Sequence, residues 1–279
     1  FTPEIPKLQR KIAQRAHMKG STMKSHTGVG QRTAVITGCA APRGIGLAVA
    51  RRYAQEGWAL VMLDIDEAAL KVAAEKVKSE FGQPVLAMHC NIGDKTSVDA
   101  AAQAVKESNM PPVGAIANVA GIASPASFLE LSLEEWNRVY AINCTGSFLV
   151  CQAFIPQMIA GGYGRIINMS SVTAQHGGGV FSKTSYAAAK AGVIGLTRGL
   201  AREFAQYGIT ANAICPGVVD TDIRVGTTPE TEAKLAEAVP MKRQCKPEEI
   251  AALYVWLSSA DAGYITGTTQ NINGGAYIA

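Results

Sequence analysis

The sequence predicts an α/β protein with a single doubly wound parallel sheet and helices on both faces of that sheet. From Thr33 onward, short apolar segments of strand length alternate with helical segments, which is typical of a parallel sheet covered on both sides. A glycine-rich stretch directly follows the first predicted strand and precedes a helix, where such sheets bind ligands. No internal repeat or second domain is found along the 279 residues, so we expect one domain.

The composition indicates a globular protein with a sizeable core. Apolar residues make up 48% of the chain and charged residues 17%. No apolar run reaches the roughly 18 residues that span a bilayer, so we expect no membrane association. The six cysteines are scattered, without CxxC pairs or nearby histidines at ligand spacing, which indicates reduced thiols, no metal site and a cytoplasmic protein.

Residues 1–32 differ from the rest of the chain in charge and pattern. They hold seven Lys or Arg residues against one Glu, a charge of +6, so the +4 of the whole chain leaves −2 for residues 33–279. Ile5, Leu8 and Ile12 fall at helical spacing, which permits a short amphipathic helix or a targeting segment. We interpret residues 1–32 as a flexible basic extension. The acidic balance of residues 33–279 offers no basic footprint for nucleic acid.

The first third of the domain contains two strand–helix units. Thr33–Thr37 is the first apolar strand, and the helix over Gly44–Glu56 follows the glycines. Ala59–Asp64 is the second strand. Asp66 is a suitable N-cap for a helix that runs to about Phe81.

The middle of the domain continues the alternation. Pro84–Cys90 is predicted as a strand, Asp94 as the start of a helix, and Val113–Asn118 as a strand. Ser132-Leu-Glu-Glu135 has the spacing of a capping box and predicts a long helix toward Gln157.

The last third supplies two longer strands and a short one. Arg165–Ser170 and Thr210–Cys215 are predicted strands on either side of a helix over Ser185–Tyr207. Pro247 is placed at a helix start, and Thr269–Ile272 is a final short strand.

Tyr186 and Lys190 lie four residues apart on one face of the Ser185–Tyr207 helix. An ammonium near a phenol favours the phenolate, so we expect Lys190 to lower the pKa of Tyr186 from about 10 toward neutral. Tyr186 is then a candidate general acid/base for an alcohol oxygen. The alternative is an amphipathic helix with an exposed lysine, which the remaining motifs argue against.

The stretch from Gly38 to Gly46 follows the first strand and opens a helix. Glycines there allow a tight turn and a close approach to a phosphate, and the helix N-terminus supplies N–H donors. A simple turn is the alternative. Asp64 ends the second strand about twenty residues further on, where a carboxylate can take the two ribose hydroxyls of an adenosine. Helix capping, its alternative role, suits Asp66 better.

Taken together, these motifs resemble the short-chain dehydrogenase/reductase family over about residues 33–279. The matching motifs occur in the family's order: the glycine loop, Asp64, Asn118-Val-Ala-Gly121, Asn143, Ser171, Tyr186 with Lys190, and Pro216-Gly217. The resemblance implies a Rossmann fold and makes residues 33–279 a dinucleotide-binding catalytic domain.

The resemblance also implies site residues. The implied catalytic residues are Asn143, Ser171, Tyr186 and Lys190. The implied cofactor contacts are Gly38, Arg43, Gly44, Ile45, Gly46, Asp64, Asn91, Ile92, Asn118, Ala120, Gly121, Tyr186, Lys190, Pro216, Gly217, Val219 and Thr221.

Each catalytic residue has an implied role. Ser171 would hydrogen-bond the substrate oxygen, with Ser170 as the neighbouring alternative. Asn143 would kink a helix and hold a water that links Tyr186 and Lys190 to solvent; an ordinary helix asparagine is the alternative. Lys190 would also hold the nicotinamide ribose.

Three positions depart from the family's pattern. Five residues separate Gly38 from Gly44 where the family usually has three, which leaves the path of the loop open. Val119 replaces the usual second asparagine. The segment between Ser171 and Tyr186 is about two residues longer than typical and contains three consecutive glycines. His176 in that segment could touch substrate or face solvent.

The resemblance implies an NAD(H)-dependent oxidoreductase that interconverts a secondary alcohol and a ketone. Asp64 favours NAD over NADP. Arg43, however, occupies a position where a basic residue in this family often contacts the 2′-phosphate of NADP. We expect a polyol, a sugar or a small hydroxy compound as substrate; the alternative is a 3-oxoacyl thioester reduced with NAD(P)H. A cofactor-sensing regulatory protein is the non-enzyme alternative, and relatives suggest a homotetramer or homodimer.

Overall fold

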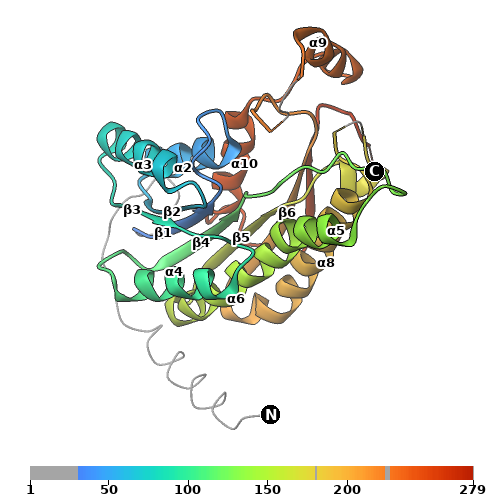
Figure 1. Cartoon of the computed structure of the whole chain (residues 1–279). Helices are drawn as coiled ribbons and strands as arrows, with labels where there is room; N and C mark the ends of the chain where they lie inside the picture. The colour runs from blue at the N-terminus through green and yellow to red at the C-terminus, as the bar shows by residue number, and fades with distance from the viewer. Residues whose placement is uncertain (1–30, 180, 224–226, 279) are drawn as a thin grey trace.

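A seven-stranded parallel sheet forms the centre of the molecule (Figure 1). The computed structural model describes residues 31–179, 181–223 and 227–278. The strand order is β3-β2-β1-β4-β5-β6-β7, and every pairing is parallel, which confirms the predicted fold class. The strands are β1 (Thr33–Thr37), β2 (Ala59–Asp64), β3 (Val85–His89), β4 (Val113–Asn118), β5 (Gly164–Met169), β6 (Ile209–Pro216) and β7 (Thr269–Ile272).

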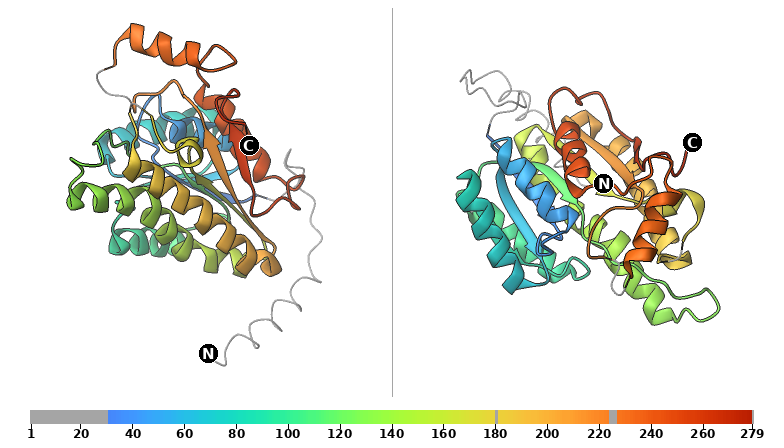
Figure 2. Two further views of the ribbon diagram at one scale, coloured as in Figure 1. Left: turned by 90° about the vertical axis from the view of Figure 1, so that its right-hand side faces the viewer. Right: turned by 90° about the horizontal axis from the view of Figure 1, so that it is seen from above.

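Helices cover both faces of this sheet, and each layer encloses its own apolar core (Figures 1 and 2). One layer consists of α2 (Ile45–Gln55), α3 (Glu67–Phe81) and α10 (Pro247–Leu257). The other layer consists of α4 (Lys95–Glu107), α6 (Gly146–Gly161) and α8 (Thr184–Phe204). Because the strand order reverses between β1 and β4, the carboxyl ends of these two strands flank the crevice where such sheets bind ligands.

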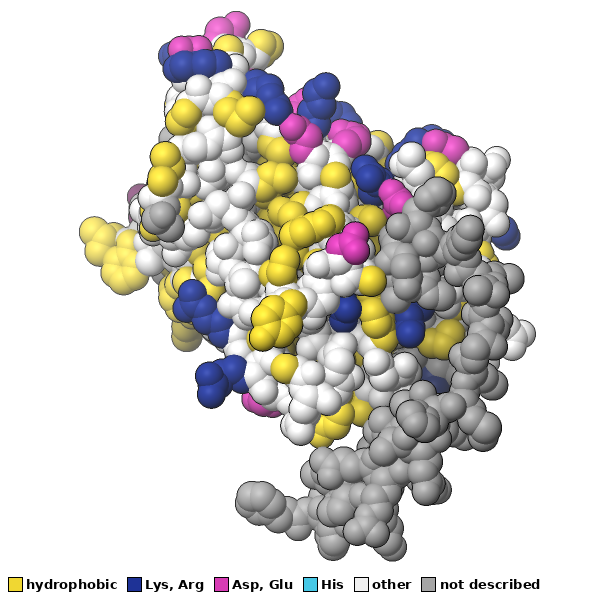
Figure 3. Space-filling view, turned by 180° about the vertical axis from the view of Figure 1, so that it is seen from behind, with side chains coloured by type: hydrophobic (Ala, Val, Ile, Leu, Met, Phe, Trp, Pro, Cys, Tyr) yellow, Lys and Arg dark blue, Asp and Glu magenta, His cyan; other side chains and the backbone are white. Residues whose placement is uncertain are grey.

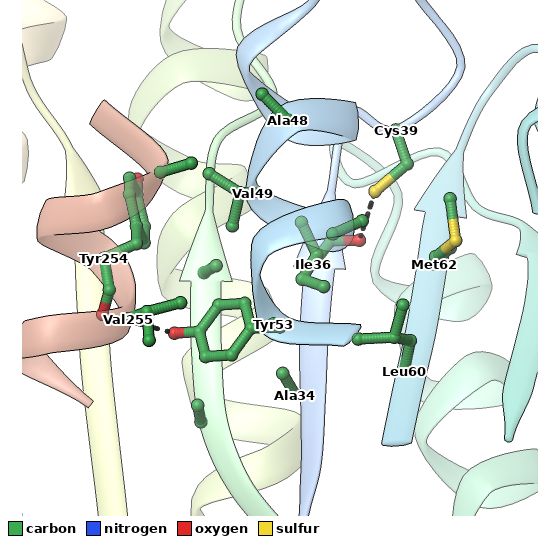
Figure 4. Packing of buried hydrophobic residues seen from close by; sticks show 14 of the residues in the cluster. Ala34, Ile36, Cys39, Ala48, Val49, Tyr53, Leu60, Met62, Tyr254 and Val255 are labelled. Carbon is green, nitrogen blue, oxygen red and sulfur yellow. Dashed lines mark hydrogen bonds between the residues drawn. The ribbon is translucent and has the colours of Figure 1, made fainter. Parts of the chain in front are cut away.

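Figure 4 shows how α2 and α10 are held together in the first layer. The ring of Tyr53 points from α2 toward Tyr254 and Val255 of α10. Its hydroxyl is buried and forms a 2.5 Å hydrogen bond with the hydroxyl of Ser258. The position of α2, and with it the glycine loop that precedes it, is therefore fixed by the core.

The predicted helix starts and strand ends agree closely with the structure. Asp66 accepts a 3.0 Å hydrogen bond from the amide of Ala69, and Asp94 accepts one of 2.9 Å from Thr96. Strand β3 begins at Val85, one residue later than predicted, because Pro84 has no N–H to donate; its carbonyl still accepts from Leu60 at 2.9 Å.

The long helix predicted from Ser132 contains a π-helical segment. It is built from α5 (Leu133–Tyr140), the π segment η1 (Ala141–Thr145) and α6, and it ends at Gly161. The Ser132 hydroxyl accepts from the Glu135 amide at 3.2 Å. The Glu135 carboxylate, however, pairs with Arg138 at 2.7 Å, so only half of the expected capping box forms.

The same helix is long and apolar enough, by length and composition, to cross a membrane. Leu133–Gly161 is 29 residues long, and half of its most apolar 18-residue stretch is buried inside the domain. It packs on β4, β5 and α4, which identifies it as a core helix of the sheet domain.

The remaining short elements lie at the edges of the two layers. They are α7 (Thr173–His176), the 3-10 turn η2 (Ala205–Tyr207) and α9 (Pro229–Ala238). In Figures 1 and 2, α9 stands apart from the sheet and its helix layers.

Arg32 belongs to the domain rather than to the extension in which the sequence pattern placed it. Its carbonyl accepts from the Ala59 amide at 3.0 Å, and its guanidinium lies 4.3 Å from the ring centre of Tyr163. The rest of the predicted extension, apart from Gln31, lies outside the described residues. On the face shown in Figure 3, Lys and Arg side chains are scattered among acidic and apolar ones and form no single basic patch.

Phe154 tests how much the second core layer contributes to stability. It is fully buried on α6, so Phe154→Ala should lower the free energy of unfolding by about 3–5 kcal/mol, measured by urea denaturation. The fully exposed Tyr264 gives the control: Tyr264→Ala should change it by less than about 0.5 kcal/mol. Equal effects of the two changes would contradict the assignment of the core.

Candidate active site

The glycine loop between β1 and α2 depends on two close backbone approaches. Gly38 has a φ of +77°, a conformation that glycine adopts without strain. A Cβ on Gly46 would lie 2.0 Å from the carbonyl oxygen of Gly38. Larger side chains at either position would therefore push the loop away from the helix start.

The first two residues after Gly38, Cys39 and Ala40, fold inward beneath the loop. The Cys39 side chain is fully buried, with its thiol 3.3 Å from the carbonyl of Ile36 (Figure 4). The Ala40 amide donates to Oδ2 of Asp64 at 2.8 Å, and the Gly44 amide donates to Ala41 at 2.9 Å. The path of the loop, which the spacing left open, is thus a compact turn tied to β2.

Asp64 is anchored at the end of β2 by both carboxylate oxygens. Besides the bond from Ala40, its Oδ1 accepts from the Asp66 amide at 3.0 Å. The carboxylate is only partly buried and lines the adjoining cavity.

A cavity of about 350 Å³ opens between the glycine loop and the ends of β2 and β4. Most of the residues expected to contact a cofactor line it: Gly38, Gly44, Ile45, Gly46, Asp64, Asn91, Ile92, Ala120, Gly121 and Thr221. Asp64 and Asp222 are the charged residues among the described lining, and both are acidic.

A second cavity of about 260 Å³ adjoins the first. The two share the lining residues Ile45, Val119, Gly121, Thr221 and Ile223. Of the expected cofactor contacts, Pro216, Gly217, Val219 and Thr221 line this second cavity, together with Ser171, Tyr186 and Lys190. Most of the expected binding residues, together with Ser171, Tyr186 and Lys190, therefore lie along one continuous crevice, whereas Asn143 lines neither cavity.

These surroundings fit a dinucleotide. Because Gly46 and Gly38 have no side chains, there is room for a phosphate at the start of α2. Asp64 offers a ribose-binding carboxylate at the end of the cavity formed by β2. The second cavity, which Tyr186 lines, would then hold the reactive ring.

Two expected cofactor contacts lie elsewhere. Asn118 is buried in the sheet, where its amide donates to Oδ1 of Asn168 at 2.9 Å, and it lines neither cavity. Arg43 lines neither cavity and lies at the edge of the crevice, where it forms ion pairs with Asp220 and, at 3.1 Å, with Asp222.

Lys190 lies at the centre of the catalytic cluster. It is 2% exposed, and its Nζ donates to the carbonyl of Met169, at the end of β5, at 2.8 Å. The same Nζ is 5.7 Å from the ring centre of Tyr186, one helical turn earlier on α8. Lys190 is thus a buried part of the site and not an exposed lysine on an amphipathic helix.

The two neighbouring serines have different roles in the structure. Ser170 donates its hydroxyl to the carbonyl of Lys190 at 2.8 Å and so fixes the helix α8 against the end of β5. Ser171 accepts from the Thr173 amide at 3.1 Å and hydrogen-bonds with Tyr186. Both serines line the second cavity, so the choice of Ser171 over Ser170 as the residue that faces substrate stays a prediction.

Asn143 lies in the π segment, behind the phenol and the ammonium. Its Nδ2 donates to the carbonyls of Ile122, at 2.9 Å, and Val139, at 3.0 Å, and its Oδ1 accepts from Ile122 at 3.2 Å. A Cβ on Gly121 would lie 2.6 Å from Oδ1 of Asn143 and 3.3 Å from Nζ of Lys190. The absence of a side chain at Gly121 therefore allows the amide and the ammonium to approach each other.

Burial sets the protonation of the catalytic pair. It lowers the pKa of Lys190 from 10.5 to about 8. It raises the pKa of Tyr186 to about 12, and the hydrogen bond with Ser171 only partly opposes this shift. The expectation that Lys190 would draw the pKa of Tyr186 toward neutral is wrong for this structure, because loss of hydration outweighs the charge of a lysine several ångströms away.

Several residues of the crevice carry no sequence signal. Asp222 comes from the loop after β6, and Phe181 and Leu235 come from the segments that flank the second cavity. His176 lines the second cavity and is exposed, so it can meet both substrate and solvent. Cys144 approaches Lys190 from the π segment closely enough to influence its pKa.

Comparisons with known proteins agree with this geometry. A family model described as enoyl-(acyl carrier protein) reductase matches residues 38–277. A short-chain type dehydrogenase/reductase of Sinorhizobium fredii, itself uncharacterised, is 37% identical and covers 88% of this chain and 98% of its own. The 3-oxoacyl-[acyl-carrier-protein] reductase of Aquifex aeolicus is 32% identical, covering 88% and 97%. The structure of L-sorbose reductase from Gluconobacter frateurii, complexed with NADPH and L-sorbose, has a TM-score of 0.84 at 28% identity and covers 91% and 99%.

Replacing Gly121 tests the packing behind the catalytic pair. Gly121→Ala would place a methyl group against Asn143 and Lys190, so kcat should fall by at least about tenfold. Gly199→Ala on α8, where a Cβ meets nothing within 4 Å, is the control and should leave kcat unchanged. A wild-type rate in Gly121→Ala would contradict the need for this close approach.

The buried ammonium predicts a pH-dependent stability in the cofactor-free protein. Because the pKa of Lys190 is about 8 when folded and 10.5 when unfolded, the cost of burying the charge is fully present below pH 8. That cost should disappear as the pH rises from 8 to 10.5. Relative to Lys190→Met, wild type should therefore gain stability across this window, on the order of a few kcal/mol.

Denaturant unfolding at several pH values measures this difference. Lys76→Met, which removes an exposed lysine from α3, is the matched control and should track wild type. A constant difference between wild type and Lys190→Met over the whole window would show that Lys190 is not charged and buried as described.

Proposed function

The chain belongs to the short-chain dehydrogenase/reductase family of NAD(P)-dependent oxidoreductases that act on CH–OH or carbonyl groups, and we propose that it uses NAD(H) to interconvert a secondary alcohol and a ketone. The observation that carries this proposal is the position of Ser171, Tyr186 and Lys190 along one cavity that continues into the dinucleotide crevice. When bound, the nicotinamide supplies or accepts the hydride.

The protein's own residues handle the proton and the oxygen. With its pKa raised to about 12, Tyr186 holds its proton at neutral pH and donates it to the carbonyl oxygen during reduction. Ser171 donates a hydrogen bond to the same oxygen and stabilises the charge that develops there. Lys190 holds a positive charge near the phenol, and Asn143 fixes the backbone of Ile122, next to the close approach at Gly121.

The charges around the crevice support the choice of NAD over NADP. Asp64 is anchored where a ribose would bind, and Asp222 adds a second carboxylate to the same cavity. A 2′-phosphate would meet both negative charges, and Arg43 is occupied by Asp220 and Asp222.

The substrate class we propose is a small secondary hydroxy compound, such as a polyol or a sugar, or the matching ketone. The second cavity, at about 260 Å³, supports a small substrate, and Ser171, Thr173 and His176 offer it hydrogen bonds. Apolar residues, however, supply much of the lining, among them Val172, Phe181, Ile223 and Leu235.

That apolar lining favours a second candidate, a 3-oxoacyl thioester. An acyl chain gains from contact with apolar walls, whereas each hydroxyl of a polyol that enters them unpaired costs free energy. The similarity to a 3-oxoacyl-[acyl-carrier-protein] reductase supports the same candidate.

The proposed enzyme is a cytoplasmic homotetramer or homodimer. Large apolar side chains are exposed on and before α5 and α6, at Phe128, Leu129, Leu133 and Phe148, and such exposure supports a subunit contact. A cofactor-sensing protein without turnover is the alternative, and the presence of all four catalytic residues argues against it. Light scattering on the purified chain measures the subunit number.

Tyr186→Phe tests the proposed proton transfer. Because the variant has no phenolic proton to transfer, kcat should fall by at least about 10²-fold while NADH binding is largely retained. Tyr207→Phe, on η2 outside both cavities, is the control and should keep the wild-type rate. Near-normal turnover in Tyr186→Phe would exclude the mechanism.

Steady-state kinetics with both cofactors test the proposed activity. A panel of polyols, sugars, hydroxy acids and 3-oxoacyl thioesters should reveal a substrate, with NAD(H) preferred by about 10- to 100-fold in kcat/KM. Asp64→Ala should shrink that preference chiefly by improving NADP(H) use, since it removes a charge that repels the phosphate. A wild-type preference for NADP(H) would contradict the cofactor assignment, and failure of every substrate would contradict the activity.

A further inference from the structure

We infer that Asp220 and Asp222 are cofactor-selectivity residues that act by holding Arg43 away from the 2′-position of the bound dinucleotide. The inference rests on the proposed use of NAD(H) and adds to it two residues from the opposite wall of the crevice.

The ion pair joins two segments that are distant in the sequence. Arg43 belongs to the loop between β1 and α2, and its two partners lie in the loop after β6, 177 residues away in the case of Asp220. The two segments form facing walls of one cavity, because Gly44 and Asp222 both line it. The guanidinium therefore links the two segments at the edge of this cavity.

Both ends of this contact are fixed by backbone hydrogen bonds. Asp220 donates its amide to the carbonyl of Cys245 at 3.0 Å, and the adjacent Val219 forms a parallel bridge with Cys245. On the other wall, the Gly44 amide donates to Ala41 at 2.9 Å. The carboxylates and the arginine thus face each other because of the fold and not through loose side chains alone.

The charge balance at this edge disfavours a phosphate. Two carboxylates, those of Asp220 and Asp222, pair with the one cation, Arg43, and a third carboxylate, that of Asp64, lines the same cavity as Asp222. To bind a 2′-phosphate, the guanidinium must leave two anionic partners, and the phosphate then meets the carboxylates that the arginine has left. NAD(H) has no 2′-phosphate, so it binds without breaking these ion pairs. The two aspartates therefore act as a repulsive element against NADP(H).

The expected effect is moderate because the three side chains are largely exposed. Their exposed fractions are 58% for Arg43, 60% for Asp220 and 51% for Asp222. Exposed ion pairs are weakened by water and salt, so the selectivity they add should be strongest at low ionic strength.

The test measures binding and not turnover. The purified full-length protein is titrated with NADH and with NADPH, and nucleotide fluorescence gives each Kd at low salt. In the D220N/D222N variant, which keeps the shape of both side chains, NADPH should bind at least about tenfold more tightly than in wild type, while NADH changes by less than about twofold.

A triple variant tests whether the freed Arg43 causes the gain in NADPH affinity. Adding Arg43→Ala to D220N/D222N should remove the part of the gain in NADPH affinity that the freed guanidinium supplies. The part that comes from removing the charge of Asp222 should remain. Arg43→Ala alone should leave NADH binding unchanged. Raising the salt concentration should reduce the gain.

Glu80→Gln is the matched control. It frees Arg51, which pairs with Glu80 at 2.6 Å and is 44% exposed, on helices away from both cavities. This variant should change neither Kd. If the double variant is unstable, Asp220→Asn and Asp222→Asn should each give a smaller, still Arg43-dependent gain in NADPH affinity, because one carboxylate remains paired with Arg43.

Two results would overturn the inference: an unchanged NADPH affinity in D220N/D222N, or a gain that survives in full without Arg43. The cofactor assignment is decided separately, by wild type alone. If wild type binds NADPH more tightly than NADH but the Arg43-dependent gain is present, the inference stands and the proposed NAD preference fails.

Discussion

The burial of one charged group, the ammonium of Lys190, is the constraint on which the rest of the site depends. It is 2% exposed and has one carbonyl partner in the described structure, that of Met169. Burying an ammonium costs free energy unless it is hydrogen-bonded, so the groups around Lys190 must be held in fixed positions. Helix α8 supplies the lysine, the end of β5 supplies the carbonyl, and Gly121 leaves room for the approach of Asn143. The π segment that carries Asn143 is thus part of the same arrangement.

Loss of hydration at each of the two side chains determines the chemistry. It raises the pKa of Tyr186 to about 12 and lowers that of Lys190 to about 8. The tyrosine is therefore a neutral acid at rest, and the lysine is close to losing its proton at mildly basic pH. Groups whose pKa values are shifted by burial in a cleft are typical of catalytic sites.

Much of the fold followed from the sequence because its signals are local. The alternation of apolar strands and helices predicted the sheet, and Asp66 and Asp94 cap the helices as expected. The Tyr186 and Lys190 spacing placed both side chains on one helix face, where they are found. These features depend on residues a few positions apart.

The features that the sequence did not predict depend on tertiary contacts. The partners of Arg43 lie on another loop, and Asn118 faces a strand neighbour, Asn168, rather than the cofactor cavity. The direction of the Tyr186 pKa shift depends on how much water the fold removes from the phenol, which spacing alone does not report. The Glu135 carboxylate bonds Arg138 instead of closing the capping box, because a guanidinium is a stronger partner than a backbone amide.

The measurement that tests this account most directly is the pKa of Lys190 in the free protein. Lysine side chains labelled with ¹³C at Cε are titrated by NMR, and the Lys190→Met spectrum assigns the signal. The account predicts a midpoint near 8 for Lys190, well below the ordinary value of 10.5. A midpoint at or above 10.5 would contradict it, because the ammonium would then be solvated or paired with an anion and not buried at the centre of the site.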